Sequence, residues 1–506
     1  MFRVNGNSYS TSDFIPFLSG RTKVQLSRQV ISCIKSNRKC LEESLANGDT
    51  IYGVNTGFGA LSQVKISEND QKLLQLNLVR SHSAGTGTPF SPEVVRLTMV
   101  LKLLDISFGY SGVRLEVAKQ LMDFLNHDIL PVVPSKGSVG ASGDLAQLSH
   151  IALALIGEGD VQFEGHVCSS IKAIKKTGLT PLTLHTKEGL TLVNGTQVST
   201  ALGVAASCSL NNLLKTADIV GALSVEASLA SRKVFRPAIH RLKKHPGQIL
   251  VSRNIWNLLA KSEIVASHRE CGQVQDPYSL RCIPHVHGSS REVISPMIKI
   301  IENEINSVSD NPLVFSDSGK VESSGHFHAE PVAQAMDAMA ISTAEIGAIS
   351  ERRIAHMMEG KVDHLPNCLA SVPGLESGYM MLQVTAGALA SENKTLATPA
   401  SVDSIPTAGG QEDLVSMAPW AGQKLLNIIE NVEKIIAVEL LTACRALEFH
   451  KPLKPAPVIN SVWKMLRRHV KMRNSDHMLS TEIETATKLI SSRKILSEVE
   501  LKMKIM

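Results

Sequence analysis

The feature that most constrains the fold of this chain is a pair of long stretches without proline. Residues 198–236 contain none, and as one continuous helix they would form a rod of roughly 58 Å at about 1.5 Å per residue. Residues 420–451 have the same character, and their apolar face comprises Leu425, Ile428, Ile429, Val432, Ile435, Ile436, Leu440 and Leu447. Helices of this length must bury apolar stripes against one another. Together with residues 328–354 they predict a mainly α fold, a long-helix bundle whose excess apolar surface suggests subunit association.

Shorter elements are predicted before these stretches. From Val113, apolar residues recur at steps of three and four until Pro131, which predicts a helix, and Ser91-Pro92 fits the cap and first position of another. The segment 160–168 alternates apolar and polar residues around a central Glu-Gly, which predicts a small exposed hairpin.

Loops divide the chain into two predicted lobes. Segments rich in Gly, Pro and Ser lie near residues 134–143, 284–290 and 398–410, and we expect them to be linkers. We predict an N-terminal lobe, 1–197, and a lobe of long helices, 198–506, that covers it.

The composition is that of an intracellular enzyme. With 506 residues, 43% of them hydrophobic, the chain can form a large core. Its 52 basic residues nearly balance 47 acidic ones and only 4% are aromatic, which gives no argument for nucleic acid. No signal peptide or apolar run of membrane-spanning length is present, and no spacing typical of a metal site is found. Eight scattered cysteines without a CxxC pair predict reduced thiols and a cytoplasmic location: Cys33, Cys40, Cys168, Cys208, Cys271, Cys282, Cys368 and Cys444.

The run GSVGASGDLAQLSH, residues 137–150, carries the most specific chemistry. At its centre the amide nitrogen of Gly143 can attack the carbonyl carbon of Ala141, because glycine tolerates the strained dihedral angles of a tight turn. Loss of water closes a five-membered ring, and a second dehydration removes the Ser142 hydroxyl. The product is 4-methylideneimidazol-5-one (MIO), an electrophile that needs no external cofactor. Taken alone, an Ala-Ser-Gly tripeptide is an ordinary loop or helix start.

Segments in the same order over residues 5–450 resemble the MIO-dependent aromatic amino acid ammonia-lyase and aminomutase family, and histidine ammonia-lyases in particular. They are IYGVNTGFG (51–59), LNLVRSHSAGTG (76–87), KEGLTLVNGTQ (187–197), VQDPYSLRC (274–282), SDNPLVF (309–315), FHAEPVA (327–333), SERRI (350–354) and ASENKTLATPASVDS (390–404). The resemblance implies an aspartase/fumarase-like helical bundle with small β hairpins and a homotetramer. It also implies elimination of ammonia from an amino acid.

The resemblance implies roles for six residues beside the MIO-forming triple. Tyr52 corresponds to the general base that removes the β proton, and Arg281 to the arginine that clamps the substrate carboxylate with its planar fork. Tyr278 corresponds to a tyrosine that supports MIO, and would share a helical face with Arg281 if this stretch is helical. The remaining residues near MIO and substrate are Asn194, Gln275 and Phe327. Taken singly, such residues are more often packing, capping or surface residues.

Two positions indicate L-histidine as the substrate and trans-urocanate as the product. His82, in a Ser-His pair, can hydrogen-bond an imidazole, and relatives acting on phenylalanine or tyrosine carry Phe-Leu or His-Leu there. Glu412, in GGQEDLVSM, matches a glutamate that phenylalanine lyases lack. Without its motif this acid would be a solvated residue in the first turn of a helix.

Four departures from the family pattern leave other functions open. His285 replaces a glutamine, His326 an asparagine, Leu414 a common histidine and Gln147 a proline. The alternatives are an aminomutase, which would add ammonia back at the β carbon, and a lyase-like subunit without catalytic activity.

Overall fold

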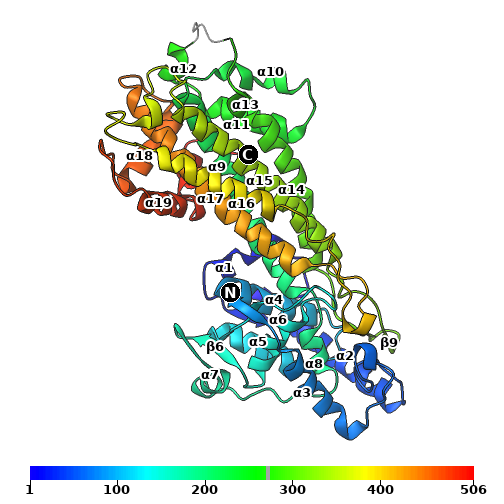
Figure 1. Cartoon of the computed structure of the whole chain (residues 1–506). Coiled ribbons are helices and arrows are strands. Elements are labelled where there is room, and N and C mark those ends of the chain that lie inside the picture. The colour runs from blue at the N-terminus through cyan, green and yellow to red at the C-terminus, as the bar shows by residue number, and fades with distance from the viewer. Residues whose placement is uncertain (269–273) are drawn as a thin grey trace. The chain divides into compact units, whose positions relative to one another are not determined.

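The computed structural model describes residues 1–268 and 274–506, and it confirms the predicted mainly α fold with a few short strands (Figure 1). The chain forms two compact units from non-contiguous segments. The first comprises Met1–Ala205, Ile298–Asp337 and Pro399–Gln423, and the second comprises Ala206–Met297, Ala338–Thr398 and Lys424–Met506. The linear division into lobes 1–197 and 198–506 stays a prediction.

The first unit contains short helices and small sheets. Its helices are α1 (Ile15–Leu18), α2 (Arg28–Ala46), α3 (Gln71–His82), α4 (Pro92–Ser107), α5 (Leu115–His127), α6 (Leu145–Leu155), α7 (Ser170–Lys176) and α8 (Glu188–Val193). Parallel strands β1 (Phe2–Val4) and β2 (Val24–Leu26) form one sheet, and antiparallel β3 (Thr86–Pro89) and β5 (Pro134–Lys136) another. The others are β4 (Leu130–Pro131), β6 (Asp160–Phe163) and β7 (His166–Ser169) in that order, and the pair β8 (Leu313–Phe315) and β9 (Lys320–Glu322).

Local predictions in this unit are confirmed. Ser91 is the N-cap of α4 with proline at its first position, and β6 pairs with β7 as a hairpin. The helix predicted between Val113 and Pro131 is α5, which ends at His127. Helix α4 is buried without interruption from Leu97 to its end at Ser107, so its charged residues Lys102 and Asp105 must find partners inside the protein.

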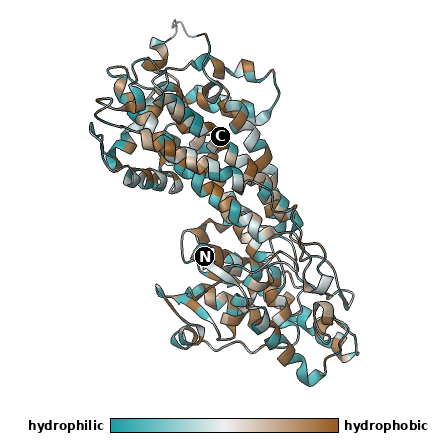
Figure 2. Cartoon of the chain, viewed as in Figure 1, coloured by the Kyte–Doolittle hydropathy of each residue, from teal (hydrophilic) through white to brown (hydrophobic). Residues whose placement is uncertain are grey.

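The second unit is dominated by long helices, along which apolar residues recur (Figure 2). The long helices, which also contribute residues to the first unit, are α9 (Gln197–Ala227), α14 (Ile283–Ile305), α15 (Glu330–Met358) and α17 (Ala418–Phe449). The others are α10 (Pro237–His240), α11 (Pro246–Leu258), α12 (Glu263–Ser267), α13 (Tyr278–Arg281), α16 (Met380–Leu396), α18 (Pro457–His469), α19 (Ser480–Ser491) and α20 (Lys494–Glu500). The eight residues of the predicted apolar face of α17 are at most 5% exposed. A buried ion pair, Arg353 with Glu439, ties α15 to α17.

Two predictions about the long helices are wrong in detail. The rod expected over 198–236 ends at Ala227, because Leu229 takes a left-handed conformation (φ 51°) and Ala230 N–H donates to the Val225 carbonyl. This is a Schellman ending with leucine where glycine is usual, so no glycine marks the stop. The linker expected near 284–290 is helical, as part of α14.

The seven described cysteines form no disulfide bond, and the eighth, Cys271, lies outside the described residues. No described helix is long and apolar enough to span a membrane.

Candidate active site

A cavity of about 960 Å³ opens in the first unit. It is enclosed by the loop after residue 51, α3, the Ala-Ser-Gly loop, α8 and the loops 323–328 and 408–414. The predicted site residues that line it are Tyr52, His82, Ala141, Ser142, Asn194, Phe327 and Glu412. Residues spread over 360 positions of the chain therefore meet around the segment with the most specific chemistry.

The Ala-Ser-Gly loop is held in a tight, glycine-dependent conformation. Gly143 has a φ of 76°, and a Cβ atom there would lie 2.0 Å from the carbonyl oxygen of Gly195. The Gly195 carbonyl accepts from Asp144 N–H at 2.8 Å, and Gly195 N–H donates to the Ser142 carbonyl at 3.2 Å. Ser138 Oγ donates to the Gly143 carbonyl at 3.0 Å. Only glycine fits at position 143, which is the residue that cyclisation requires, so the loop fits an MIO group.

Asp144, the residue after Gly143, anchors the Ala-Ser-Gly loop through hydrogen bonds. Its fully buried carboxylate accepts from Ser199 N–H at 2.8 Å and Ser199 Oγ at 2.6 Å, which ties the loop to the first turns of α9. Burial raises the pKa of Asp144 to about 6, against the opposing effect of these hydrogen bonds.

Tyr52 lines the cavity, and its phenolic oxygen is held by the backbone. The oxygen accepts a hydrogen bond from Gly59 N–H at 3.0 Å, and the ring packs edge-on against Phe58. The turn that bears the tyrosine needs Gly53, whose φ is 64° and where a Cβ would meet Leu190 at 2.7 Å. The hydroxyl proton of Tyr52 is not needed for this backbone contact, which leaves the oxygen able to exchange a proton with a substrate.

His82, the last residue of α3, is fixed in one tautomer. Its Nδ1 lies 3.0 Å from the Leu78 carbonyl, which can only accept, so Nδ1 carries the proton. Ser81 Oγ lies 3.1 Å from the same nitrogen. Burial lowers the pKa of His82, and the Leu78 carbonyl and the Glu412 charge oppose that shift. The neutral ring therefore has Nε2 as a hydrogen-bond acceptor.

Glu412 lies beside the tripeptide. One carboxylate oxygen accepts from Thr407 Oγ1 at 2.6 Å, and the other accepts from Ser142 Oγ at 3.3 Å. The backbones of Thr407 and Glu412 are bridged as well, which fixes the turn that carries the glutamate. The cavity thus combines an acceptor imidazole and a carboxylate with the Ala-Ser-Gly loop.

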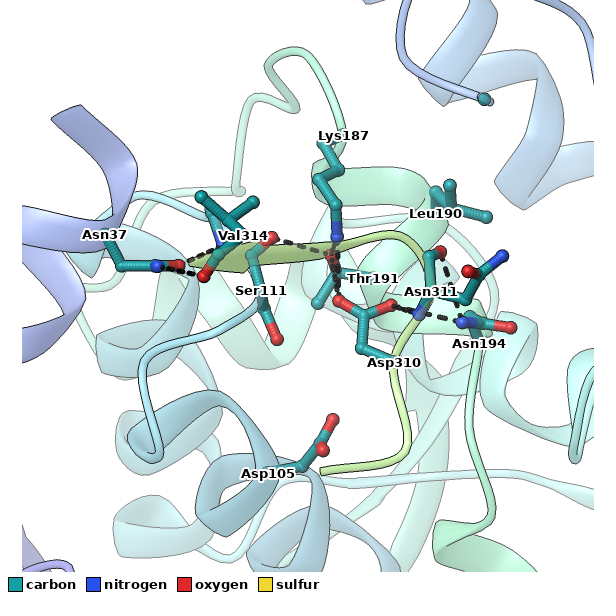
Figure 3. A network of polar contacts seen from close by, with 12 residues as sticks. Asn37, Asp105, Ser111, Lys187, Leu190, Thr191, Asn194, Asp310, Asn311 and Val314 are labelled. Carbon is teal, nitrogen blue, oxygen red and sulfur yellow. Dashed lines mark hydrogen bonds and ion pairs between the residues drawn. The ribbon is translucent and has the colours of Figure 1, made fainter. Parts of the chain in front are cut away.

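Asn194 follows the last residue of α8, and its side-chain nitrogen is held on both sides. Nδ2 donates to Asp310 Oδ1 at 3.1 Å and to the Asn311 carbonyl at 3.3 Å (Figure 3). Since both partners are acceptors, the amide orientation is fixed, and the side-chain oxygen points away from Asp310 (Figure 3). Asn194 and Asn311 both line the cavity.

Three predicted site residues lie in the second unit and are not among the residues that line this cavity: Gln275, Tyr278 and Arg281. Tyr278 and Arg281 are the ends of the short helix α13, so the condition for a shared helical face is met, and the Arg281 guanidinium lies 4.7 Å from the centre of the Tyr278 ring. Tyr278 is 72% exposed. Their roles stay predictions.

Comparison with known proteins assigns the family. The family model for aromatic amino acid lyases matches residues 9–468. The chain belongs to the aromatic amino acid lyase family. It is 47% identical to the histidine ammonia-lyase of Vibrio cholerae serotype O1 over 468 residues, 92% of either chain.

Solved structures of the family agree. A histidine ammonia-lyase from Trypanosoma cruzi is similar with a TM-score of 0.91 and 37% identity, over 99% of this chain and 95% of that one. A tyrosine aminomutase from Streptomyces globisporus is similar with a TM-score of 0.94 and 31% identity, over the full length of both. The helical-bundle fold is therefore that of the lyases and aminomutases alike.

The four departures from the family pattern lie in different surroundings. Leu414 lines the cavity and is 64% exposed, whereas His326 is outside the lining, exposed, and contacts Ser324 Oγ. Gln147 is buried in α6 and donates to the Ser135 carbonyl at 3.3 Å. His285, in the second unit, packs against His240, and burial lowers its pKa. Of these four, Leu414 alone borders the described cavity.

Reasoning from the sequence missed residues that shape the site. Asn311 and His328 line the cavity, and both stand inside segments that carry the family resemblance, SDNPLVF and FHAEPVA. The buried partner of Asn194, Asp310, stands in the first of these segments. Its position in that segment is the sequence signal that could have found it.

Proposed function

We propose that this protein eliminates ammonia from L-histidine and releases trans-urocanate. The observation that carries the proposal is the cavity itself, where His82 and Glu412 meet the Ala141-Ser142-Gly143 loop. A histidine ammonia-lyase 47% identical over nearly the whole chain supports the same substrate.

The reaction breaks the bond between the α carbon and the amine and removes a proton from the β carbon. An amine is a poor leaving group, and an MIO group formed from Ala141, Ser142 and Gly143 would supply the electrophile that makes its loss feasible. Tyr52 would accept the β proton through its phenolic oxygen, which Gly59 N–H holds in place. Arg281 would bind the carboxylate, Tyr278 would support the electrophile, and Gln275 and Phe327 would complete the contacts with substrate and ring.

The selection of histidine follows from the hydrogen-bonding capacity of the cavity. His82 Nε2 is an acceptor in the fixed tautomer, so it can receive the N–H of a substrate imidazole. Glu412 can take a second ring N–H or the charge of an imidazolium. A phenylalanine ring offers neither donor and would leave both groups unpaired.

An aminomutase is the second candidate, favoured by the full-length similarity to a tyrosine aminomutase. It would use the same residues and return ammonia to the β carbon. A lyase-like subunit without activity is the third, and it would have no chemical need for an intact loop and Tyr52 together.

One experiment separates the three candidates. Purified protein is incubated with L-histidine, urocanate is followed by absorbance, and every amino acid product is separated by chromatography. Urocanate supports the lyase, a β-amino acid the mutase, and no product the inactive subunit. The intact mass of the mature protein should be about 36 Da, two waters, below that of the unmodified chain.

Ser142→Ala is the informative variant and Ser149→Ala its matched control. Alanine at 142 has no hydroxyl to eliminate, so the mass deficit of two waters should vanish and activity should fall by several orders of magnitude with the fold intact. Ser149 is buried in α6 and donates only to the Leu145 carbonyl of its own helix. Its variant should keep both the mass deficit and the activity.

The assembly and location are also proposals. Exposed apolar residues on and before α16 support association into the homotetramer that the family resemblance implies: Val372, Leu375, Met380, Met381 and Val384. A cytoplasmic location agrees with the lack of disulfide bonds among the described cysteines.

A further inference from the structure

Three buried charged residues, Lys102, Lys187 and Asp310, form a network around Asn194. Lys187 and Asp310 make an ion pair at 2.8 Å (Figure 3). Lys102 joins them through hydrogen bonds to the Thr191 and Asn194 carbonyls. The exposed fractions of Lys102, Lys187 and Asp310 are 1%, 0% and 0%. None of the three lines the cavity, so none can contact a substrate there. Burying charges costs several kcal/mol per ion, and well-packed apolar residues often replace such pairs without loss of stability. Stability alone therefore does not account for these buried charges.

Both carboxylate oxygens of Asp310 accept hydrogen bonds from neighbouring side chains. Oδ2 accepts from Lys187 Nζ at 2.8 Å and Thr191 Oγ1 at 2.9 Å, and Oδ1 accepts from Asn194 Nδ2 at 3.1 Å (Figure 3). Burial, the largest single influence, would raise the pKa of Asp310, but the charges of Lys187 and Lys102 and the hydrogen bonds from Lys187 and Asn194 together hold this pKa below its usual range. The group is therefore a carboxylate, which can only accept. Asn194 must turn its nitrogen to it and its oxygen away.

Lys102 holds the backbone of the same segment. Its ammonium group donates to the Thr191 carbonyl at 3.0 Å and the Asn194 carbonyl at 2.5 Å, at the end of α8. A cation at a helix C-terminus is favourable, since the last carbonyls carry partial negative charge. The next residue is Gly195, whose carbonyl would lie 2.0 Å from a Cβ on Gly143. The hydrogen bond from Lys102 to the Asn194 carbonyl is thus one residue away from Gly195, whose backbone packs against the Ala-Ser-Gly loop.

We propose that Lys102, Lys187 and Asp310 are positioning residues that act through Asn194 and Gly195. Lys102 holds the Gly195 backbone against the Ala-Ser-Gly loop, in the compact arrangement that cyclisation needs. Asp310, with Lys187 beside it, turns the Asn194 oxygen toward the cavity, where it can accept a hydrogen bond from the substrate ammonium group. This inference rests on the proposed function, since it assigns the network to the same reaction.

The test compares Lys102→Met and Asp310→Asn with Glu188→Gln. Glu188 is a fully buried carboxylate on the same short helix, paired at 2.7 Å with the partly buried Arg114, so its variant also removes a buried charge from an ion pair without touching Asn194. For each full-length protein three quantities are measured: the fraction of chains lacking two waters by intact mass, kcat/KM for L-histidine, and the thermal midpoint.

The network variants should differ from each other and from the control. Lys102→Met should lower the dehydrated fraction at least twofold, because the segment facing Gly143 loses its anchor. Asp310→Asn should leave most chains dehydrated and lower kcat/KM by roughly 100-fold, the size expected for misplacing a contact group by about 1 Å. Glu188→Gln should lower the thermal midpoint and leave the other two quantities within about threefold.

Two results would overturn the inference. One is complete dehydration and near wild-type kcat/KM in both network variants. The other is an equal loss of these quantities in Glu188→Gln at a matched drop in thermal midpoint. If Lys102→Met does not fold, Lys102→Gln, which keeps one donor, takes its place. A wild-type protein without the mass deficit or without histidine turnover would instead contradict the proposed function.

Discussion

Replacing His82 by leucine should remove the preference for an imidazole ring. The variant deletes the Nε2 acceptor of His82, a residue that lines the cavity and whose Nδ1 is occupied by the Leu78 carbonyl. A substrate N–H buried without a partner costs about 1–3 kcal/mol, which corresponds to roughly a 5- to 150-fold loss in kcat/KM for histidine. Phenylalanine has no such N–H, so kcat/KM for any residual phenylalanine turnover should change much less.

Glu412→Gln should also lower kcat/KM for histidine, because it weakens a second contact with the substrate imidazole. Hydrogen bonds to charged groups contribute about 1.5–3 kcal/mol, so the expected loss for histidine is roughly 10- to 150-fold. Because both side chains would bind one small ring, the double variant should depart from additivity by about 0.5 kcal/mol or more.

The assay is the measurement of kcat/KM for both amino acids in wild type, the two single variants and the double variant. His127→Leu is the matched control, since His127 ends α5 and makes the same hydrogen bond to the carbonyl four residues earlier, away from the cavity. It should leave both substrates unaffected. The histidine assignment fails if phenylalanine is already the better substrate of the wild type, or if the double variant leaves histidine turnover unchanged.

Other predictions test separate parts of the site and fold. Tyr52→Phe should lower kcat by about 10²- to 10⁴-fold, the usual contribution of a general base, with the intact-mass deficit retained. Arg281→Lys should cost roughly 2–4 kcal/mol in kcat/KM, because an ammonium cannot reproduce bidentate carboxylate binding, and an unchanged kcat/KM would place the carboxylate elsewhere. Burial raises the pKa of Glu226 from 4.5 to about 7, so the unfolded chain releases this proton first and the free energy of unfolding should fall as pH rises across that window. Glu226→Gln should flatten this pH dependence, which thermal melts at about pH 5 and about pH 7.5 would show.

The regular elements of the fold were predictable because periodic patterns encode them. The apolar face of α17, the hairpin of β6 and β7 and the proline-initiated helix α4 all follow from spacing within a few turns of chain. The end of α9 was not predictable in this way, since Leu229 adopts a conformation that sequence rules reserve for glycine.

The helix over 284–290 shows the opposite error. Pro284 suits the first turn of a helix, and Gly288 is there because a Cβ would meet Gln248 N at 2.4 Å. Proline and glycine are typical of loops, but here one lies in the first turn of the helix and the other allows a close approach of α11.

The candidate site was predictable where a residue stands in a motif and hidden where it acts at a distance in sequence. Tyr52, His82 and Glu412 were named from their surroundings, and they meet at one cavity. Lys102 was not, because a buried charge gives no pattern along the chain, and Asp310 was not, although it stands in the SDNPLVF segment. Only the folded backbone brings α4 and the segment after α14 to the end of α8.

The hydrogen bond between Ser142 and Glu412 gives the site an order of events. The Ser142 hydroxyl that contacts Glu412 is the one that dehydration would expel. Before dehydration, one oxygen of the Glu412 carboxylate, the proposed partner of the substrate imidazole, is therefore occupied by this hydroxyl. Loss of that hydroxyl would create the electrophile and release the carboxylate together. The newly made protein would thus be a poor receptor for histidine until it is also able to react with it, and recognition and reactivity would begin at the same moment.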